Sequence, residues 1–228
     1  PVFVLSDLDI GMNDWMIPEL KWDDNYRPDR GKVLSSDEVD KLEKFYRYLD
    51  VDGDGIAART LPGENAKGAY FVRGSGHNKH GMYTESSEEY KDLVDRLLVK
   101  WDTARTLVPQ PVLTQAEQKT SIGIIAFGSS HGAVLEALDE LHEKGIHADY
   151  MRVRAFPFNG EVTGFVEQHD TIFVVEQNRD AQFRSLLILE TNTDARKLIP
   201  VLHYSGMPIP GECVVEGVCE HLCAKDVA

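Results

Sequence analysis

From Thr120 onward, short apolar runs alternate with longer amphipathic segments. Residues 122–127 are almost all apolar, which is typical of a parallel strand covered on both faces. The same pattern predicts further strands at 148–153, 171–176 and 197–202, and helices at about 130–144, 160–169, 181–191 and 211–222. Strands and helices in this order form right-handed βαβ units. We therefore predict an α/β domain at residues 119–228, a parallel sheet with helices on both faces.

Residues 1–118 are irregular by comparison and rich in Asp, Gly and Pro. Two amphipathic helices are predicted, at 36–49 with Ser36 as its N-cap and at 87–106. Their apolar faces exceed what the surrounding segment can bury, so we expect a partner to cover them. The apolar run from Pro1 to Leu5 is typical of the last strand of a preceding domain, and we expect the chain to be a fragment. Residues 1–118 are thus interpreted as the end of that domain plus a connecting segment.

Composition narrows the function classes. The net charge of −14 argues against nucleic acid or an anionic membrane as a partner, because both attract basic surfaces. Apolar runs stay well short of the ~20 residues that a membrane helix needs. The cysteines Cys213, Cys219 and Cys223 are odd in number and clustered, which favours a reducing, cytoplasmic setting over a disulfide framework.

The segment from Gly128 to Gly132 reads Gly-Ser-Ser-His-Gly and satisfies the G-x-S-x-G pattern between a strand and a helix. In a serine hydrolase Ser130 would be the nucleophile, with Asp170 or Asp194 and His203 completing the triad. Alternatively, Ser130 caps the helix by accepting a backbone N–H. The residues upstream do not supply the strands of a hydrolase sheet, so the cap is the favoured interpretation.

Three other motifs suggest ligands. Asp50 to Ile56 reproduces the first half of an EF-hand loop, but Leu61 replaces the twelfth-position Glu; the alternatives are incidental calcium binding and a solvated acidic loop. Arg73 to Gly81 begins like a dinucleotide loop but lacks its third glycine, which favours a polar loop that contacts a neighbouring subunit. The C-terminal cysteines and His221 lack the close cysteine pair of a zinc site, so we assign no metal site.

As an ordered set, these segments resemble the alpha subunits of 2-oxoacid:ferredoxin oxidoreductases. The start, Pro1 to Asp7, resembles the closing strand of the family's thiamine-pyrimidine domain. The residues that resemble its connecting region are Asp54-Gly55-Ile56, Arg59, Pro62-Gly63, Arg73-Gly74-Ser75-Gly76-His77, Tyr83-Thr84-Glu85, Asp95-Arg96 and Lys100. Phe173-Val174-Val175-Glu176-Gln177-Asn178 through Gln182 resembles the transketolase-C-terminal-like domain that ends these subunits. The likeness is closest to the 2-oxoglutarate type.

The resemblance implies oxidative decarboxylation of a 2-oxoacid, expected to be 2-oxoglutarate, to acyl-CoA, with electrons passing to ferredoxin. Thiamine diphosphate, Mg²⁺ and an iron–sulfur cluster are expected in the full complex and none in this chain, whose Gly53-Asp54-Gly55 lacks the context of a diphosphate motif. The expected partner is the beta subunit of an oligomer, with ferredoxin and CoA acting through the complex. No residue is assigned a catalytic role. Arg73, His77 and His80 are expected to contact substrate or a subunit.

On this interpretation the chain alone serves assembly and is inactive. The competing class is a non-catalytic interaction module, in which the same α/β domain only holds subunits together.

Overall fold

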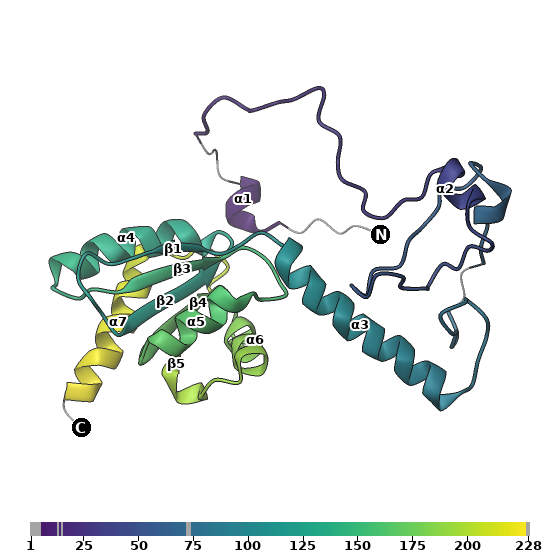
Figure 1. The fold of residues 1–228 in the computed structure, drawn as a ribbon. Coiled ribbons are helices and arrows are strands. Elements are labelled where there is room, and N and C mark those ends of the chain that lie inside the picture. The colour runs from purple at the N-terminus through teal and green to yellow at the C-terminus, as the bar shows by residue number, and fades with distance from the viewer. Residues whose placement is uncertain (1–5, 13, 15, 72–73, 227–228) are drawn as a thin grey trace. The chain divides into compact units, whose positions relative to one another are not determined.

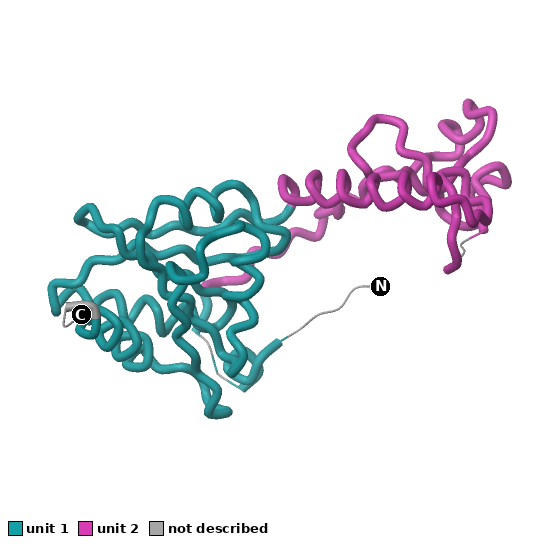
Figure 2. The backbone as a smooth tube through the Cα atoms, turned by 90° about the horizontal axis from the view of Figure 1, so that it is seen from below, with its two compact units in different colours: residues 1–17, 108–228 teal, residues 18–107 magenta. Residues whose placement is uncertain are grey.

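The computed structural model describes residues 6–226 except 13, 15, 72 and 73, so the predicted strand at residues 1–5 lies outside the described residues. The chain forms two compact units (Figure 2): residues 1–17 with 108–228, and residues 18–107. Residues 108–118, predicted to belong to the connecting segment, join the first unit because strand β1 (Val112–Thr114) pairs with its sheet.

The first unit is built on a five-stranded sheet in the order β1-β3-β2-β4-β5. Strands β2 (Ile122–Phe127), β3 (Asp149–Val153), β4 (Thr171–Glu176) and β5 (Leu198–Leu202) are parallel, and β1 is an antiparallel edge. The predicted parallel sheet is therefore confirmed. From β2 the chain moves to β3 on one side and later to β4 on the other, so the connections change direction between β2 and β4.

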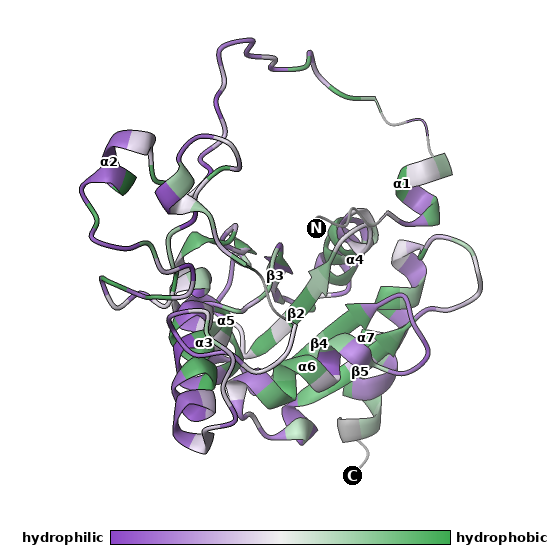
Figure 3. Ribbon diagram, turned by 90° about the vertical axis from the view of Figure 1, so that its right-hand side faces the viewer, coloured by the Kyte–Doolittle hydropathy of each residue, from purple (hydrophilic) through white to green (hydrophobic). Residues whose placement is uncertain are grey.

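Helices cover both faces of this sheet (Figure 1), as predicted. Helices α4 (Ser130–Glu143) and α7 (Gly211–Asp226) bury one face, and α5 (Gly160–Gln168) and α6 (Gln182–Thr191) bury the other. All six residues of β4 are buried, and Figure 3 shows this strand mostly in the hydrophobic colour. A short 3₁₀ turn (Ala195–Lys197) leads into β5, and helix α1 (Leu8–Met12) precedes the second unit.

The second unit is mostly irregular, with helices α2 (Ser36–Asp40) and α3 (Ser87–Leu107) and a 3₁₀ turn at Ala66–Gly68. Helix α3 matches the prediction at 87–106. The prediction of one helix from 36 to 49 is wrong, because α2 ends at Asp40 and its N-cap is Ser35, paired with Glu38 in a capping box.

Side chains from elsewhere in the unit bind carbonyl oxygens at α2 and just after it. The Lys67 ammonium bonds to the carbonyl oxygens of Asp40 and Leu42, and the Asn65 amide bonds to Ser36 O.

A glycine joins α3 to the rest of the second unit. Gly55 has φ +79°, and a Cβ there would lie 2.2 Å from Lys100 N and 2.8 Å from Arg96 O. Its carbonyl accepts a hydrogen bond from Arg96 Nη1 at 2.7 Å, and Thr103 Oγ1 donates to Asp54 O at 2.7 Å. The Asp54-Gly55-Ile56 motif is thus a backbone contact with α3, which only glycine permits.

Within the described residues, no helix is both long enough and apolar enough to cross a membrane.

Candidate functional site at the carboxyl ends of the parallel strands

The parallel strands end at one edge of the sheet, and polar side chains gather where the connections change direction between β2 and β4. In open α/β sheets ligands bind in the crevice at this position. Two cavities lie at this edge, of about 610 Å³ and about 330 Å³, and both are lined by Phe127 and Gly128 at the end of β2. This edge is therefore the candidate site of the first unit.

The turn after β2 is held by a short chain of hydroxyl and amide groups. Gly128 has φ +62°, and α4 begins at Ser130. Ser129 Oγ donates to Asp7 Oδ2 at 2.6 Å and accepts from Gln177 Nε2 at 2.9 Å. Asp7 also accepts the Ile10 N–H and so caps the short α1. These hydrogen bonds lower the pKa of Asp7 below its usual value, and the bond from Ser129 has the largest effect.

The prediction that Ser130 caps α4 is wrong. The N-cap residue is Ser129, and its side chain makes no capping hydrogen bond. The Ser130 hydroxyl, in a residue only 2% exposed, instead accepts from Gln177 Nε2 at 3.3 Å. Ser130 therefore contacts Gln177, the residue after β4, and makes no capping hydrogen bond in α4.

The hydrolase alternative is also unsupported, because the predicted triad is not assembled. The His203 imidazole contacts Ser205 Oγ at 2.8 Å, Met207 O at 3.0 Å and Cys213 Sγ at 3.7 Å. The Asp194 carboxylate is occupied by Arg196. A buried serine bonded to an amide has no base to activate it.

The family-like motif at 176–178 organises the start of α6. Glu176 is fully buried, and its carboxylate accepts hydrogen bonds from Phe183 N at 2.8 Å, Arg184 N at 3.1 Å and Asn178 Nδ2 at 2.6 Å. Asn178 Oδ1 accepts the amides of Asp180 and Gln182. A buried carboxylate needs such donors, and the first turn of a helix has amide groups to offer. Glu176 and Asn178 are thus structural, whereas Gln177 faces the turn after β2.

A histidine–tyrosine pair lies beside this edge. His131 Nδ1 is 3.1 Å from the hydroxyl of Tyr150, which is fully buried on β3. Burial raises the pKa of Tyr150 to about 12, whereas burial and the charge of Arg152 lower the pKa of His131. Both groups are therefore neutral at pH 7, and one hydrogen bond joins them.

In the second unit, the loop at 74–85 places His77 and His80 against two tyrosines. The His77 ring lies 4.0 Å from the Tyr48 ring, and the His80 ring 4.5 Å from the Tyr46 ring. Asn78 fixes the loop by accepting the amides of His80 and Met82 and by donating to Glu89 on α3. Arg73, the third residue expected here, lies outside the described residues.

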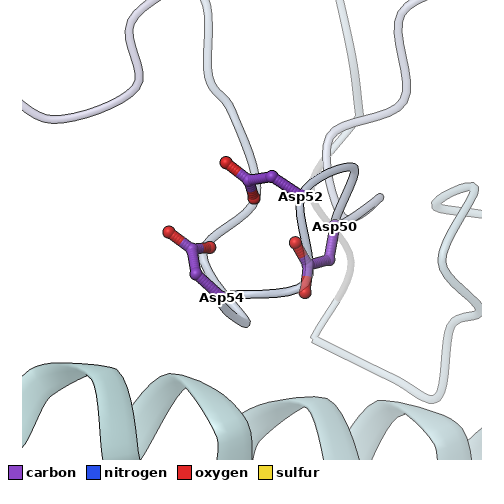
Figure 4. Close-up of side chains that lie close together, drawn as sticks. All are labelled: Asp50, Asp52 and Asp54. Carbon is purple, nitrogen blue, oxygen red and sulfur yellow. The ribbon is translucent and has the colours of Figure 1, made fainter.

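The acidic loop of the EF-hand-like motif binds the ammonium group of Lys32. Asp50, Asp52 and Asp54 offer carboxylate oxygens within 4.8 Å of one another (Figure 4). Lys32 Nζ lies 2.6 Å from an oxygen of Asp52, 2.6 Å from one of Asp54 and 3.0 Å from Ile56 O. Asp50 accepts the amides of Gly53 and Gly55. The structure thus favours a solvated acidic loop in which Lys32 balances part of the negative charge.

The C-terminal cysteines do not converge on one point. Cys213, Cys219 and Cys223 all lie on α7, and within the described residues they form no metal-binding group with His221. Burial, followed by the charges of Glu216 and Glu212, raises the pKa of Cys213. Its sulfur therefore stays protonated at pH 7, which does not suit a nucleophile.

Sequence reasoning missed Lys32, and it missed the contacts of Asp7 and Gln177, which it quoted only as parts of family-like segments. For Lys32 and Asp7 no local signal exists, because their partners lie far along the chain. The contact of Gln177 could have been expected, since a polar residue that follows an apolar strand lies at the carboxyl edge of the sheet.

Alignments with related proteins cover most of the chain. No protein-family model matches it. The 2-oxoacid:ferredoxin oxidoreductase subunit alpha of Saccharolobus solfataricus is 27% identical over 96% of this chain and 34% of its own length. Subunit alpha of enzyme 2 from Aeropyrum pernix is 26% identical over 79% of this chain and 27% of its own length.

A solved structure agrees in fold. The 2-oxoglutarate:ferredoxin oxidoreductase of Magnetococcus marinus, with 2-oxoglutarate, coenzyme A and succinyl-CoA bound, matches with a TM-score of 0.71 and 23% identity. The match covers 80% of this chain and 32% of that chain. The chain spans about one third of the length of these relatives. It is a homologue of the alpha subunits of 2-oxoacid:ferredoxin oxidoreductases.

Proposed function

We propose that the chain is the C-terminal part of the alpha subunit of a thiamine-diphosphate-dependent 2-oxoacid:ferredoxin oxidoreductase, which converts 2-oxoglutarate to succinyl-CoA in the cytoplasm. The observation that carries this proposal is the match of alpha subunits across 96% of the chain. The 2-oxoglutarate assignment has additional support from a 104-residue match, 29% identical, to 2-oxoglutarate synthase subunit KorA of Archaeoglobus fulgidus.

The Gly53-Asp54-Gly55 segment and the cysteines of α7 do not fit the cofactors of this reaction. In Gly53-Asp54-Gly55, the Asp54 carboxylate is held by Lys32 and the Ile56 amide, and Gly55 lies against the backbone of α3. Neither group is available to a diphosphate or to its Mg²⁺. An iron–sulfur cluster needs thiolates that converge, which those of α7 do not. Accordingly, thiamine diphosphate and the cluster belong to the beta subunit or to other domains, and this chain serves assembly.

His77 and His80 are the residues that we assign to contact a subunit or substrate. Their rings lie on tyrosines of one short segment, and His80 is exposed. Arg73 is assigned to the same contact from the family resemblance alone.

The test is reconstitution of the full-length alpha subunit with its beta subunit. We expect reduction of ferredoxin that requires both coenzyme A and a 2-oxoacid, and that is faster with 2-oxoglutarate than with pyruvate. A complex that reduces ferredoxin with neither acid would refute the function. Faster turnover of pyruvate would refute only the substrate.

The 228-residue chain by itself should show no turnover and no calorimetric heat with micromolar thiamine diphosphate. His80→Ala should weaken copurification of the beta subunit, whereas Arg196→Ala, in the first unit, should not. Equal copurification of both variants would remove His80 from the proposed contact.

A further inference from the structure

Helix α3 carries a stripe of apolar side chains that lie exposed on the second unit. Tyr90, Val94, Leu97 and Leu98 are 62%, 37%, 47% and 61% exposed, and no residue of this 21-residue helix is buried. Tyr90, Val94 and Leu97 follow one another at intervals of four and three residues, and Trp101 continues this spacing. Figure 3 shows hydrophobic and hydrophilic colours side by side along α3. Apolar residues with this seven-residue repeat are the pattern by which one helix packs along another.

A different side of α3 attaches the helix to its own unit. The side chains of Arg96 and Thr103 bond to the backbone carbonyls of Gly55 and Asp54. Successive residues of a helix are rotated by about 100°, so Leu97 lies about 100° around the helix axis from Arg96. The attachment of α3 therefore leaves the apolar stripe, defined by Tyr90, Val94, Leu97 and Leu98, open to a further contact.

The charged residues of α3 are sorted around this stripe. In heptad notation Val94 occupies position a, and Tyr90 and Leu97 occupy position d. The charged residues at the bordering positions e and g are all basic, and they are Lys91, Lys100 and Arg105. The acidic residues all lie at positions b, c and f, away from the stripe, and they are Glu88, Glu89, Asp92, Asp95 and Asp102. This basic border contrasts with the net charge of −14 of the whole chain.

Two of the bordering charges have no partner within the chain. Lys91 and Lys100 are exposed, and their ammonium groups form no hydrogen bond or ion pair with any described residue. Arg105, in contrast, pairs with Asp102 at 3.3 Å. Charges at e and g face the corresponding positions of a partner helix and determine which partner is accepted. The border of the stripe therefore favours a partner with carboxylates at these positions.

The same charges argue against two other occupants. A second copy of α3 would bring basic e and g positions against each other in either orientation, and like charges at such positions are destabilising. A helix that lies on an anionic membrane carries Lys and Arg across its polar face, whereas the polar face of α3 carries the acidic residues.

We propose that the apolar stripe of α3 is the docking site for an amphipathic helix of a partner polypeptide, whose apolar side chains are bordered by Asp and Glu. The apolar side chains of the partner pack against the stripe, and its carboxylates reach Lys91 and Lys100. From Tyr90 to Trp101 the stripe is about 17 Å long, which corresponds to about three turns of a partner helix. This docking does not depend on the reaction proposed for the complex.

The test is binding of two synthetic peptides to the 228-residue chain, followed by fluorescence anisotropy. Both peptides carry Leu at a and d over three heptads; one has Glu at every e and g position, and the other has Lys. We expect the Glu peptide to bind with a Kd below about 100 μM, and the Lys peptide to bind at least about tenfold more weakly. Because the whole chain is acidic, non-specific attraction would favour the Lys peptide, so a preference for the Glu peptide reports the local charge.

Reversal of the bordering charges should exchange this preference. Lys91→Glu combined with Lys100→Glu should weaken binding of the Glu peptide about tenfold or more and strengthen binding of the Lys peptide. The matched control combines Lys21→Glu with Lys119→Glu, which changes the net charge equally at exposed positions outside α3. It should leave the preference for the Glu peptide unchanged.

A second pair of variants tests the apolar stripe itself. Leu97→Ala should weaken binding of the Glu peptide about tenfold or more, as expected for a central apolar contact. Val99→Ala is the control, because Val99 is 42% exposed on the same helix but lies at position f. It should leave binding unchanged.

The absence of binding, or equal binding of the two peptides, would overturn the proposal, as would equal weakening by Leu97→Ala and Val99→Ala. A dimer in light scattering that Leu97→Ala dissociates would assign the stripe to a second copy instead. Binding to phosphatidylserine vesicles that Leu97→Ala abolishes would assign it to a membrane surface.

Discussion

The two units are stabilised by different kinds of interaction. In the first, nearly continuous apolar strands are buried between two helical layers. In the second, the buried apolar side chains among the described residues are only Val39 and Phe45, and α3 has no buried residue. Lysine and asparagine side chains there bond to backbone groups 20 or more residues away.

This contrast bears on stability. Apolar burial is the main favourable term in folding, and exposed hydrogen bonds contribute little net free energy. The first unit should therefore unfold cooperatively, and the second should open at lower free energy. Helix α3 exposes apolar residues, among them Tyr90 and Leu98, and we predict that a partner covers this helix.

The largest effect should come from the core of the first unit. Phe173→Ala removes a fully buried ring from β4 and should lower the free energy of unfolding by about 3–5 kcal/mol. Leu189→Ala, at a position 79% exposed on α6, should change it by less than about 0.5 kcal/mol. Urea unfolding followed by circular dichroism measures both, and similar losses in the two variants would contradict the assigned core.

Gly55→Ala should open the second unit alone. It places a methyl group against the backbone of α3 and should lower the local free energy of opening by about 3 kcal/mol or more. Gly53→Ala is the control, because Gly53 has a similar φ of +81° but nothing within 4 Å of its added Cβ. It should cost about 1–2 kcal/mol. Hydrogen exchange of α3 amides separates the two, and equal exchange would show that the close contact is unimportant.

Lys32→Gln should loosen the acidic loop by a smaller amount. Although desolvation opposes it, the carboxylates of Asp52 and Asp54 raise the pKa of Lys32, so the ammonium is charged at pH 7. Its loss leaves carboxylates facing one another and should speed hydrogen exchange at Ile56 and Gly55. Lys21→Gln, at an exposed position of the same unit, should not. Millimolar calcium should leave exchange in the unmodified chain unchanged, and protection by calcium there would show that lysine does not fill the loop.

The smallest effect should be the release of α1 by acid. The pKa of Asp7 in the folded chain lies below its usual value of 3.8, so its contacts stabilise the docked α1 above that pH. They are lost as pH falls through the folded pKa. The amide resonances of Ile10 and Ser130 should therefore shift below about pH 3.8. In Asp7→Asn this step should be absent, and its persistence would assign it to another group.

The secondary structure of the first unit could be predicted more fully than that of the second, because apolar burial leaves a pattern in the sequence and long-range polar contacts do not. Strand β4 and helix α4 were predictable because their apolar periodicity alone determines which face is buried. All three residues of β1 are exposed, so this strand carries no such pattern. The side chains of Asn65 and Lys67 bond to carbonyl oxygens of α2, and Lys32 binds the acidic loop; all three contacts join residues that are far apart in sequence. In the candidate site, the motif at 173–178 could be recognised from the sequence. The hydrogen bonds from Gln177 to Ser129 and Ser130 could not be predicted from it.

The burial of Glu176 has a consequence for how this protein could acquire new ligands. In many α/β proteins the amino end of a helix at this edge is itself the receptor for anions. Here the chain supplies its own carboxylate to α6, so that receptor is permanently occupied from within. The start of α6 is thus closed to an external anion, and recognition at this edge rests on groups other than the amide groups of that helix.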